Sequence, residues 1–283
     1  MKHKHAATDY TQSMLPQTRK ALFFDILHLQ WKNLLLMGGL GLLFYAPLLL
    51  STVFQDVYIS SLYSTLTDAD DRQLMEASQT LMHLDVIRNF IHILFAAIFS
   101  VALAGMGRVI RQHAWGENVH TYTDFTRGIR ENFCQTAVLA MLASLIYALC
   151  LMIFYNATQS DFLTGALSML PIGISLLVVL PVLATANAMV PVYSNRLWAT
   201  LKNAFYVYCR SLLKTLGGLF ACLLIWVPSL IPNFYCHLFG SIGAVLLTPF
   251  ALLAWTLLCY NRFDKHINPL VAPQLISKGI IHS

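Results

Sequence analysis

Five long runs of this 283-residue chain contain no Asp, Glu, Lys or Arg. A helix that crosses the ~30 Å hydrocarbon core of a membrane needs ~20 mostly apolar residues, and a charge near its centre is costly. The composition agrees, because 57% of the residues are hydrophobic and 11% are charged, against about 25% charged in soluble domains. The sequence therefore predicts an integral membrane protein. The uncharged runs are Leu34–Gln55, Asn89–Gly107, Asn132–Ser160, Phe162–Asn195 and Thr215–Asn261.

These runs predict an all-α fold with six transmembrane helices. The last run is too long for one crossing, and Pro228, Pro232 and Asn233 mark a turn within it. The fourth run contains Pro171 and Pro181, so we expect that helix to be kinked or to be longer than the bilayer is thick. The expected spans are Leu34–Phe54, Phe90–Gly107, Cys134–Tyr155, a part of Leu163–Pro191, Thr215–Ile231 and Phe239–Tyr260.

The positive charges predict the orientation, because Lys and Arg are enriched on the cytoplasmic side of membrane proteins. Sixteen of the eighteen fall in segments that the six spans place on one side, and only Arg72 and Arg88 fall on the other. Both termini are therefore expected in the cytoplasm. The predicted organisation is a flexible N-terminal tail (1–20), a single six-helix domain (21–269) with an outer helical loop (55–89), and a cytoplasmic C-terminal tail (270–283).

Amphipathic segments precede the first, third and fifth spans. Their apolar residues recur at spacings of three and four, which indicates helix, and basic residues occupy the opposite faces. Such helices lie in the headgroup plane of the bilayer, or one of them docks onto a cytoplasmic partner, with Arg127, Arg130 and Arg210 as candidate contacts. The apolar faces comprise Leu22, Phe23, Ile26, Leu27 and Trp31, then Phe125, Ile129 and Phe133, then Leu197, Leu201, Phe205, Tyr208 and Leu212.

The spans themselves offer little chemistry. They contain no carboxylate, Lys or Arg, whereas ion-coupled carriers usually place ionisable groups there. The polar exceptions are His92, Thr185 and Asn187, which either bond a neighbouring helix or contact a solute. No catalytic, phosphate-binding or metal-binding motif is present, and the six cysteines form no C-x-x-C pair. We therefore expect a non-enzymatic protein, without cofactor or nucleic acid, whose surroundings are the lipid bilayer.

The outer loop is the one sizeable segment expected outside the membrane on the side opposite the termini. It is acidic, and its second half, Asp68 to Met82, has the pattern of a helix. Asp70 and Asp71 favour a helix start, because carboxylates are stabilised at helix N-termini. The loop is interpreted as a lid over the bundle or as a docking surface for an extracellular partner.

Four short segments together carry a family resemblance. One enters the first span, one enters the third, one leads to the fifth, and one follows the sixth. In this order and placement the chain resembles the YesL-like family of bacterial membrane proteins, a domain of unknown function. The segments are Trp31–Leu35 (WKNLL), Asp124–Phe133 (DFTRGIRENF), Thr200–Phe205 (TLKNAF) and Phe263–Pro269 (FDKHINP).

The resemblance implies a multi-pass protein of the bacterial cytoplasmic membrane and no catalytic residues. Members of the family are often encoded beside ATP-binding-cassette sugar importers. An accessory role in carbohydrate uptake is therefore the leading hypothesis, with importer subunits or a solute-binding protein as partners. One alternative is a transporter of a neutral solute, with the kinked fourth span and Asn187 lining the path. Another is a membrane scaffold or sensor that acts through the basic interfacial helices.

Overall fold

The structure, a computed structural model, describes residues 16–65, 70–158, 162–193, 195–231 and 233–281. Every element assigned within these ranges is a helix. Six helical segments are long and apolar enough to cross a membrane, which confirms the predicted all-α fold with six spans. The protein is a multi-pass membrane protein. The six segments are Arg19–Leu62, Arg72–Ala114, Thr121–Thr158, Phe162–Met189, Leu212–Leu230 and Phe234–His266.

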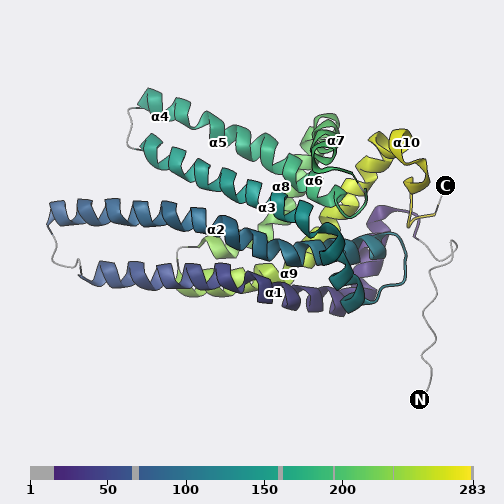
Figure 1. Cartoon of the computed structure of the whole chain (residues 1–283), viewed down its shortest axis with the longest axis horizontal. Helices are drawn as coiled ribbons and strands as arrows, with labels where there is room; N and C mark the ends of the chain where they lie inside the picture. The colour runs from purple at the N-terminus through teal and green to yellow at the C-terminus, as the bar shows by residue number, and fades with distance from the viewer. Residues whose placement is uncertain (1–15, 66–69, 159–161, 194, 232, 282–283) are drawn as a thin grey trace, which may run out of the picture.

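Four of the spans are built around continuous α-helices and two are composite (Figure 1). The continuous ones are α1 (Arg19–Thr65), α2 (Asp71–Ala114), α3 (Thr121–Thr158) and α9 (Phe234–His266). The fourth span consists of α4 (Phe162–Ser168), α5 (Leu170–Ile174), the π-helix η2 (Ser175–Val179) and α6 (Leu180–Met189). The fifth consists of α8 (Leu212–Leu223) and the 3-10 helix η3 (Leu224–Leu230). The remaining elements are α7 (Leu197–Arg210), α10 (Asn268–Val271) and η4 (Pro273–Leu275).

Both ends of the described chain lie at the same end of the bundle, which we call the terminal end (Figure 1). The backbone N–H of Ile281 donates to the carbonyl of Pro16 across 3.1 Å. The opposite end is the hairpin end, where α1 and α2 meet.

The two prolines of the fourth span lie where its helix type changes. Pro171 occupies the first turn of α5 and Pro181 the first turn of α6. A proline is tolerated in a first turn because the N–H that it lacks has no intrahelical partner there. The segment between these two helices widens into the π-helix η2, and such π-helical turns occur frequently at functional sites.

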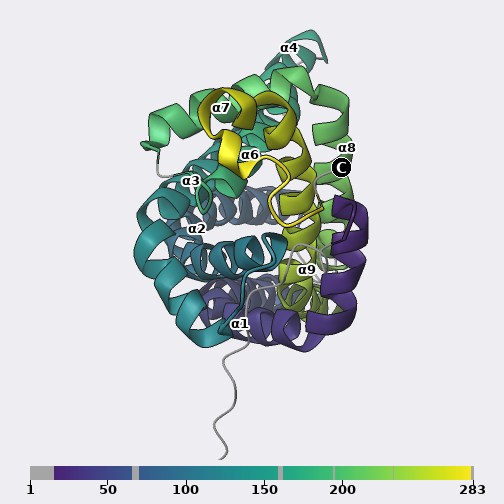
Figure 2. The ribbon, with the colours of Figure 1, turned by 90° about the vertical axis from the view of Figure 1, so that its right-hand side faces the viewer.

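The three amphipathic segments are helical, but only one of them is a separate helix. The first continues into the span within α1 and the second within α3, because no residue between segment and span ends the helix. The third is α7, which Ser211 separates from α8 by a non-helical backbone (φ −141°, ψ 35°). Figure 2 looks onto the terminal end and shows α7 and the first part of α1 running across it.

The predicted outer loop is mostly helix. α1 has 47 residues and α2 has 44, so at ~1.5 Å per residue each is roughly twice as long as the hydrocarbon core is thick. The predicted helix start is confirmed, since the Asp70 carboxylate accepts from the Gln73 N–H at 2.8 Å and the Gln73 side chain accepts from the Asp70 N–H. The predicted helix starts at Asp68, which lies in residues 66–69, outside the part of the chain that the structure describes. The hairpin projects along the axis of the bundle (Figure 1). The two interpretations of this segment, a lid or a docking surface, remain predictions.

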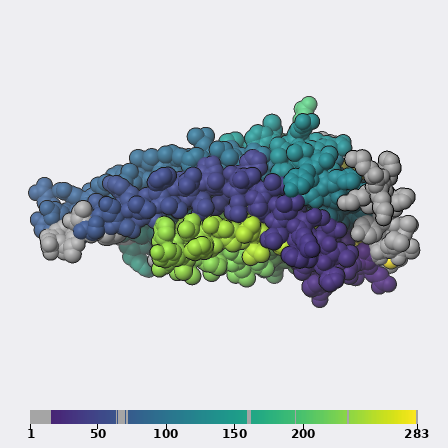
Figure 3. All heavy atoms as spheres, turned by 90° about the horizontal axis from the view of Figure 1, so that it is seen from below, coloured from purple at the N-terminus to yellow at the C-terminus, as the bar shows by residue number. Residues whose placement is uncertain are grey.

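Close helix contact holds α1 against α9, which Figure 3 shows lying side by side. A Cβ atom added to Gly38 would lie 2.4 Å from the carbonyl oxygen of Leu246 and 2.8 Å from its Cα. Small residues allow backbones to approach in a membrane, where no hydrophobic effect drives helices together. Gly38 therefore fixes how closely the two spans pack.

The C-terminal tail is part of the folded terminal end. The Lys278 ammonium pairs with Glu117 at 3.0 Å and lies 3.7 Å from the ring centre of Trp115. The Lys278 carbonyl accepts a hydrogen bond from Arg19 at 2.7 Å. Gly279 has φ +87°, and a Cβ there would lie 2.0 Å from the Ala114 carbonyl oxygen, so this position requires glycine.

A polar chain also joins three elements at the terminal end. Arg19 of α1 pairs with Asp264 of α9 at 2.9 Å, and both side chains are largely buried. Asp264 accepts from Asn268 at 2.7 Å, and Asn268 in turn accepts from the Tyr193 hydroxyl. Burial, and then the nearby Asp264 carboxylate, raise the pKa of Tyr193, so its hydroxyl remains protonated and donates.

Candidate functional site

Two adjoining cavities enter the bundle near its terminal end. The outer one, which we call the vestibule, has a volume of about 280 Å³. The inner cavity has a volume of about 20 Å³, and both are lined by Asn132 and Pro191. The vestibule is also lined by Arg111, Glu131, Gln135, Val190, Val192 and Tyr193. The inner cavity is also lined by Leu103, Ala104, Gly107, Thr136, Asn187, Ala188, Leu252, Trp255 and Thr256.

Three spans supply the polar walls of the inner cavity. Asn132 and Thr136 lie one turn apart on α3, Asn187 lies on α6, and Thr256 lies on α9. Gly128 brings α3 against α2, because a Cβ there would lie 2.9 Å from the Ala104 carbonyl oxygen. The cavity is therefore set between helices whose backbones are held close.

The four polar side chains of the inner cavity make no hydrogen bond to any residue that the structure describes. Threonine in a helix commonly bonds the carbonyl four residues earlier, as Thr185 and Thr248 do at 2.8 and 2.9 Å. Thr136 and Thr256 do not. Most buried polar groups in proteins are satisfied, and one water needs about 10–15 Å³ of such volume. The cavity therefore has room and partners for a water or for one polar group of a solute.

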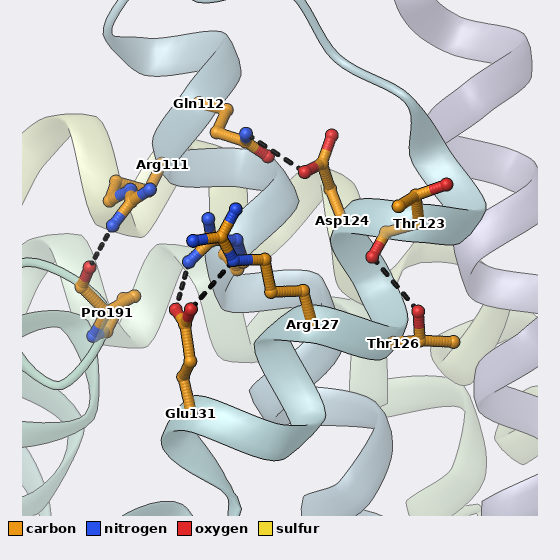
Figure 4. A network of polar contacts seen from close by, with 9 residues as sticks. Arg111, Gln112, Thr123, Asp124, Thr126, Arg127, Glu131 and Pro191 are labelled. Atoms are coloured by element: carbon orange, nitrogen blue, oxygen red, sulfur yellow. Dashed lines mark hydrogen bonds and ion pairs between the residues drawn. The ribbon is translucent and has the colours of Figure 1, made fainter.

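An ion-paired network frames the vestibule (Figure 4). Glu131 accepts from Arg127 Nε at 2.8 Å and pairs through its other oxygen with Arg108. Arg111 donates to the carbonyl of Pro191 at 2.9 Å. On the neighbouring turn, Asp124 accepts from the Gln112 amide at 3.1 Å. The ends of α2 and α3 and the segment after α6 are thereby tied together around the vestibule.

The structure brings together only part of the predicted site. Asn187 lines the inner cavity, and Arg127 lies in the vestibule network through Glu131. Thr185 is fully buried, bonds the Pro181 carbonyl of its own helix, and lines neither cavity. The other predicted residues lie elsewhere. His92 bonds Ser51 at 2.9 Å nearer the hairpin end, Arg130 is exposed on α3, and Arg210 lies 5.4 Å from the ring of Tyr206 on α7.

Several lining residues were missed from the sequence. Asn132 and Thr136 have helical spacing of four at the start of an uncharged run, a signal that marks one polar face on the third span. Thr256 gave no such signal, because it stands alone in an apolar run. Arg111 was noted only as a positive charge of a loop, and Gln135 only as part of the third uncharged run.

An aromatic layer lies between the inner cavity and the hairpin end. Phe99 lies one turn farther from the terminal end of α2 than Leu103. Its ring packs 5.3 Å from that of Tyr45, which packs 5.9 Å from Trp226. Beyond this aromatic layer, Asp85 pairs with Arg88 and accepts from Gln55. This aromatic layer and the polar contacts of Asp85 therefore lie on the hairpin side of the inner cavity.

Comparisons with protein-family models, with curated proteins and with solved structures find no match for this chain. The resemblance to the YesL-like family remains a prediction. Within the described ranges, no three His, Cys, Asp or Glu side chains are grouped so that they could hold a metal ion. The functional argument therefore depends on the cavities and the charges around them.

Proposed function

We propose that this protein binds a small polar solute and carries it across the bacterial cytoplasmic membrane without enzymatic chemistry. The observation that supports this most is the inner cavity, where Asn132, Thr136 and Asn187 present hydrogen-bonding groups that no described residue occupies. Solute sites in transporters are typically formed beside discontinuous helices. Asn187 stands on the composite fourth span, two turns after the π-helix η2 ends at Val179.

The charge distribution supports placing the terminal end in the cytoplasm, with both termini there. In that orientation the vestibule lies toward the cytoplasm, and the aromatic layer of Tyr45, Phe99 and Trp226 lies on the outer side of the inner cavity. This arrangement corresponds to an inward-facing state of a carrier that alternates access around a fixed site.

Asn187→Ala is expected to lower solute uptake about two- to tenfold, because one hydrogen bond contributes roughly 0.5–1.5 kcal/mol. The measurement is uptake of a panel of radiolabelled sugars, polyols and organic acids into proteoliposomes that contain only this protein. Asn203→Ala is the matched control, since Asn203 lies on α7 and lines neither cavity. Uptake that is absent for every solute, or unchanged in the Asn187 variant, contradicts the proposal.

The orientation has its own test in the free cysteines. Cys236 is exposed at the start of α9, while Cys134 and Cys209 are exposed near the terminal end. A membrane-impermeant maleimide applied to intact cells is expected to label Cys236 and to spare the other two. Each single-cysteine variant is compared with the same variant in opened cells. Labelling of Cys134 or Cys209 in intact cells reverses the orientation.

The accessory role in carbohydrate uptake is a second candidate, and the projecting hairpin favours it. Val57, Tyr58 and Met75 are exposed there and offer an extramembrane surface to a solute-binding protein or importer subunit. Purification in mild detergent after crosslinking is expected to recover such a subunit if this role is correct. A scaffold or sensor function would instead depend on α7, whose exposed Lys202 and Trp198 face away from the bundle.

A further inference from the structure

The Arg111 guanidinium is held as a free donor in the wall of the vestibule. Its Nη1 donates to Pro191, and the group lies 4.6 Å from the ring centre of Trp115. Its Nε is buried without a hydrogen-bond partner, and no described residue accepts from its Nη2. A guanidinium fixed in this way has little conformational freedom left to lose when it binds a ligand. Its fork of N–H donors matches the two oxygens of a carboxylate or phosphate.

The charges around the vestibule are predominantly positive. Three guanidinium groups, those of Arg108, Arg111 and Arg127, face one carboxylate, Glu131. Both oxygens of Glu131 are already engaged by Arg108 and Arg127, which leaves Arg111 without an anionic partner. Two further carboxylates lie nearby: Glu117 is paired with Lys278, and Asp124 accepts from Gln112 and from the His120 N–H. A cavity with excess charge of one sign and low-dielectric walls concentrates ions of the opposite sign.

The two cavities differ in the groups that they suit. The inner cavity is lined only by neutral polar and apolar side chains, so an uncharged part of a solute fits there. The vestibule, at about 280 Å³, is close to the lower limit of ~300–1,000 Å³ for small-molecule sites. Asn132 and Pro191 belong to both walls, so one molecule can contact both.

We propose that the solute is a small organic anion whose carboxylate or phosphate binds Arg111 in the vestibule, with its uncharged hydroxyl-bearing part directed toward Asn132 and Asn187. This inference rests on the proposed function and narrows its solute from polar to anionic. It also replaces the neutral solute of the sequence-based alternative. Gln135 adds an unpartnered buried oxygen to the same wall, which suits a hydroxyl donor beside the anionic group.

Trp115 provides the readout, because its ring lies against Arg111. The purified protein in maltoside detergent is titrated with sodium gluconate, with inorganic phosphate, and with sorbitol as the neutral counterpart of gluconate. Ionic strength is held constant with sodium chloride. The expected result is a saturable change in tryptophan fluorescence with both anions and a much weaker response to sorbitol. Trp115→Phe is expected to remove the signal.

Arg111→Gln is expected to weaken anion binding about tenfold or more, since hydrogen bonds to charged groups are among the stronger ones. Arg111→Lys keeps the charge but loses the two-pronged geometry of the guanidinium. Its affinity for the anions is therefore expected to lie between those of the wild-type protein and Arg111→Gln. Arg130→Gln is the matched control, because Arg130 is an exposed arginine that lines neither cavity. Melting temperatures of all variants verify that they are folded.

Three outcomes overturn the inference: no saturable response to either anion, an equal response to sorbitol, or an unchanged affinity in both Arg111 variants. Any of them leaves the proposed function intact if uptake of a neutral solute still depends on Asn187. Conversely, anion binding through Arg111 without Asn187-dependent uptake overturns the carrier and not the anion site. Nanodiscs distinguish a lipid headgroup from a free solute as the anion that binds Arg111. If the fluorescence response to gluconate and phosphate is lost in phosphatidylglycerol nanodiscs but kept in phosphatidylcholine nanodiscs, the site binds a lipid headgroup, and the solute assignment is overturned.

Discussion

Gly38→Ala is expected to destabilise the protein by about 1–3 kcal/mol, the usual cost of overpacking. The added Cβ would meet the backbone of Leu246, with its carbonyl oxygen at 2.4 Å and its Cα at 2.8 Å. Backbone atoms in the middle of α9 cannot rotate away as a side chain can, so α1 and α9 must separate. Gly38→Val is expected to have a still larger effect, because its branched side chain needs more room. The measurement is the melting temperature of the wild-type protein and of each variant in the same detergent.

The neighbouring glycine is the control. A Cβ at Gly39 would meet nothing within 4 Å, and alanine favours helix over glycine by roughly 0.5–1 kcal/mol. Gly39→Ala is therefore expected to be neutral or slightly stabilising. Equal melting temperatures for the two alanine variants would contradict close packing of α1 on α9 at this point.

Asp264→Asn is expected to produce the second large loss of stability. Asp264 and Arg19 have side chains that are 15% and 9% exposed, so the pair is well removed from water. Removing one partner of a buried pair leaves the other charge uncompensated, at a cost of about 3–5 kcal/mol. Asparagine can still bond Asn268, and Arg19 retains its bond to the Lys278 carbonyl, so the lower part of that range is expected.

A double-mutant cycle distinguishes this pair from a general loss of charge. In Asp264→Asn combined with Arg19→Gln no buried charge is left unpaired, so the double variant is expected to lose less stability than the two single variants together. Asp25→Asn is the control, since Asp25 is an exposed carboxylate on α1 without an ion pair among the described residues. Single-variant effects that add to within about 0.5 kcal/mol would show that the two residues act independently.

The sequence predicts the spans well because uncharged length is what a membrane requires. It predicts helix ends poorly. The second span was expected at Phe90–Gly107, whereas α2 runs from Asp71 to Ala114. Hydropathy marks the part of a helix that lies in lipid, and a helix continues into water wherever polar residues with good helix propensity follow. The joined interfacial segments of α1 and α3 have the same explanation.

The candidate site could be predicted only in part. Asn187 attracts notice as a lone amide in an apolar run, but the same signal selects Thr185, whose hydroxyl is satisfied within its own helix. In a span that is apolar on all sides, the sequence does not indicate which face meets other helices. Arg111 was counted only as one of many positive charges, because its contact with Trp115 and its place in the vestibule wall depend on tertiary packing.

The docked C-terminal tail has a practical consequence for handling the protein. Lys278 and Arg111 both lie against the ring of Trp115. Arg111 is part of the vestibule wall, so this ring connects the tail to the vestibule. A bulky fusion attached shortly after Ile281 would therefore load a segment that is docked against this ring. Because Pro16 bonds Ile281 in the same docked end, a purification handle at either end is best cleaved before anion binding is measured.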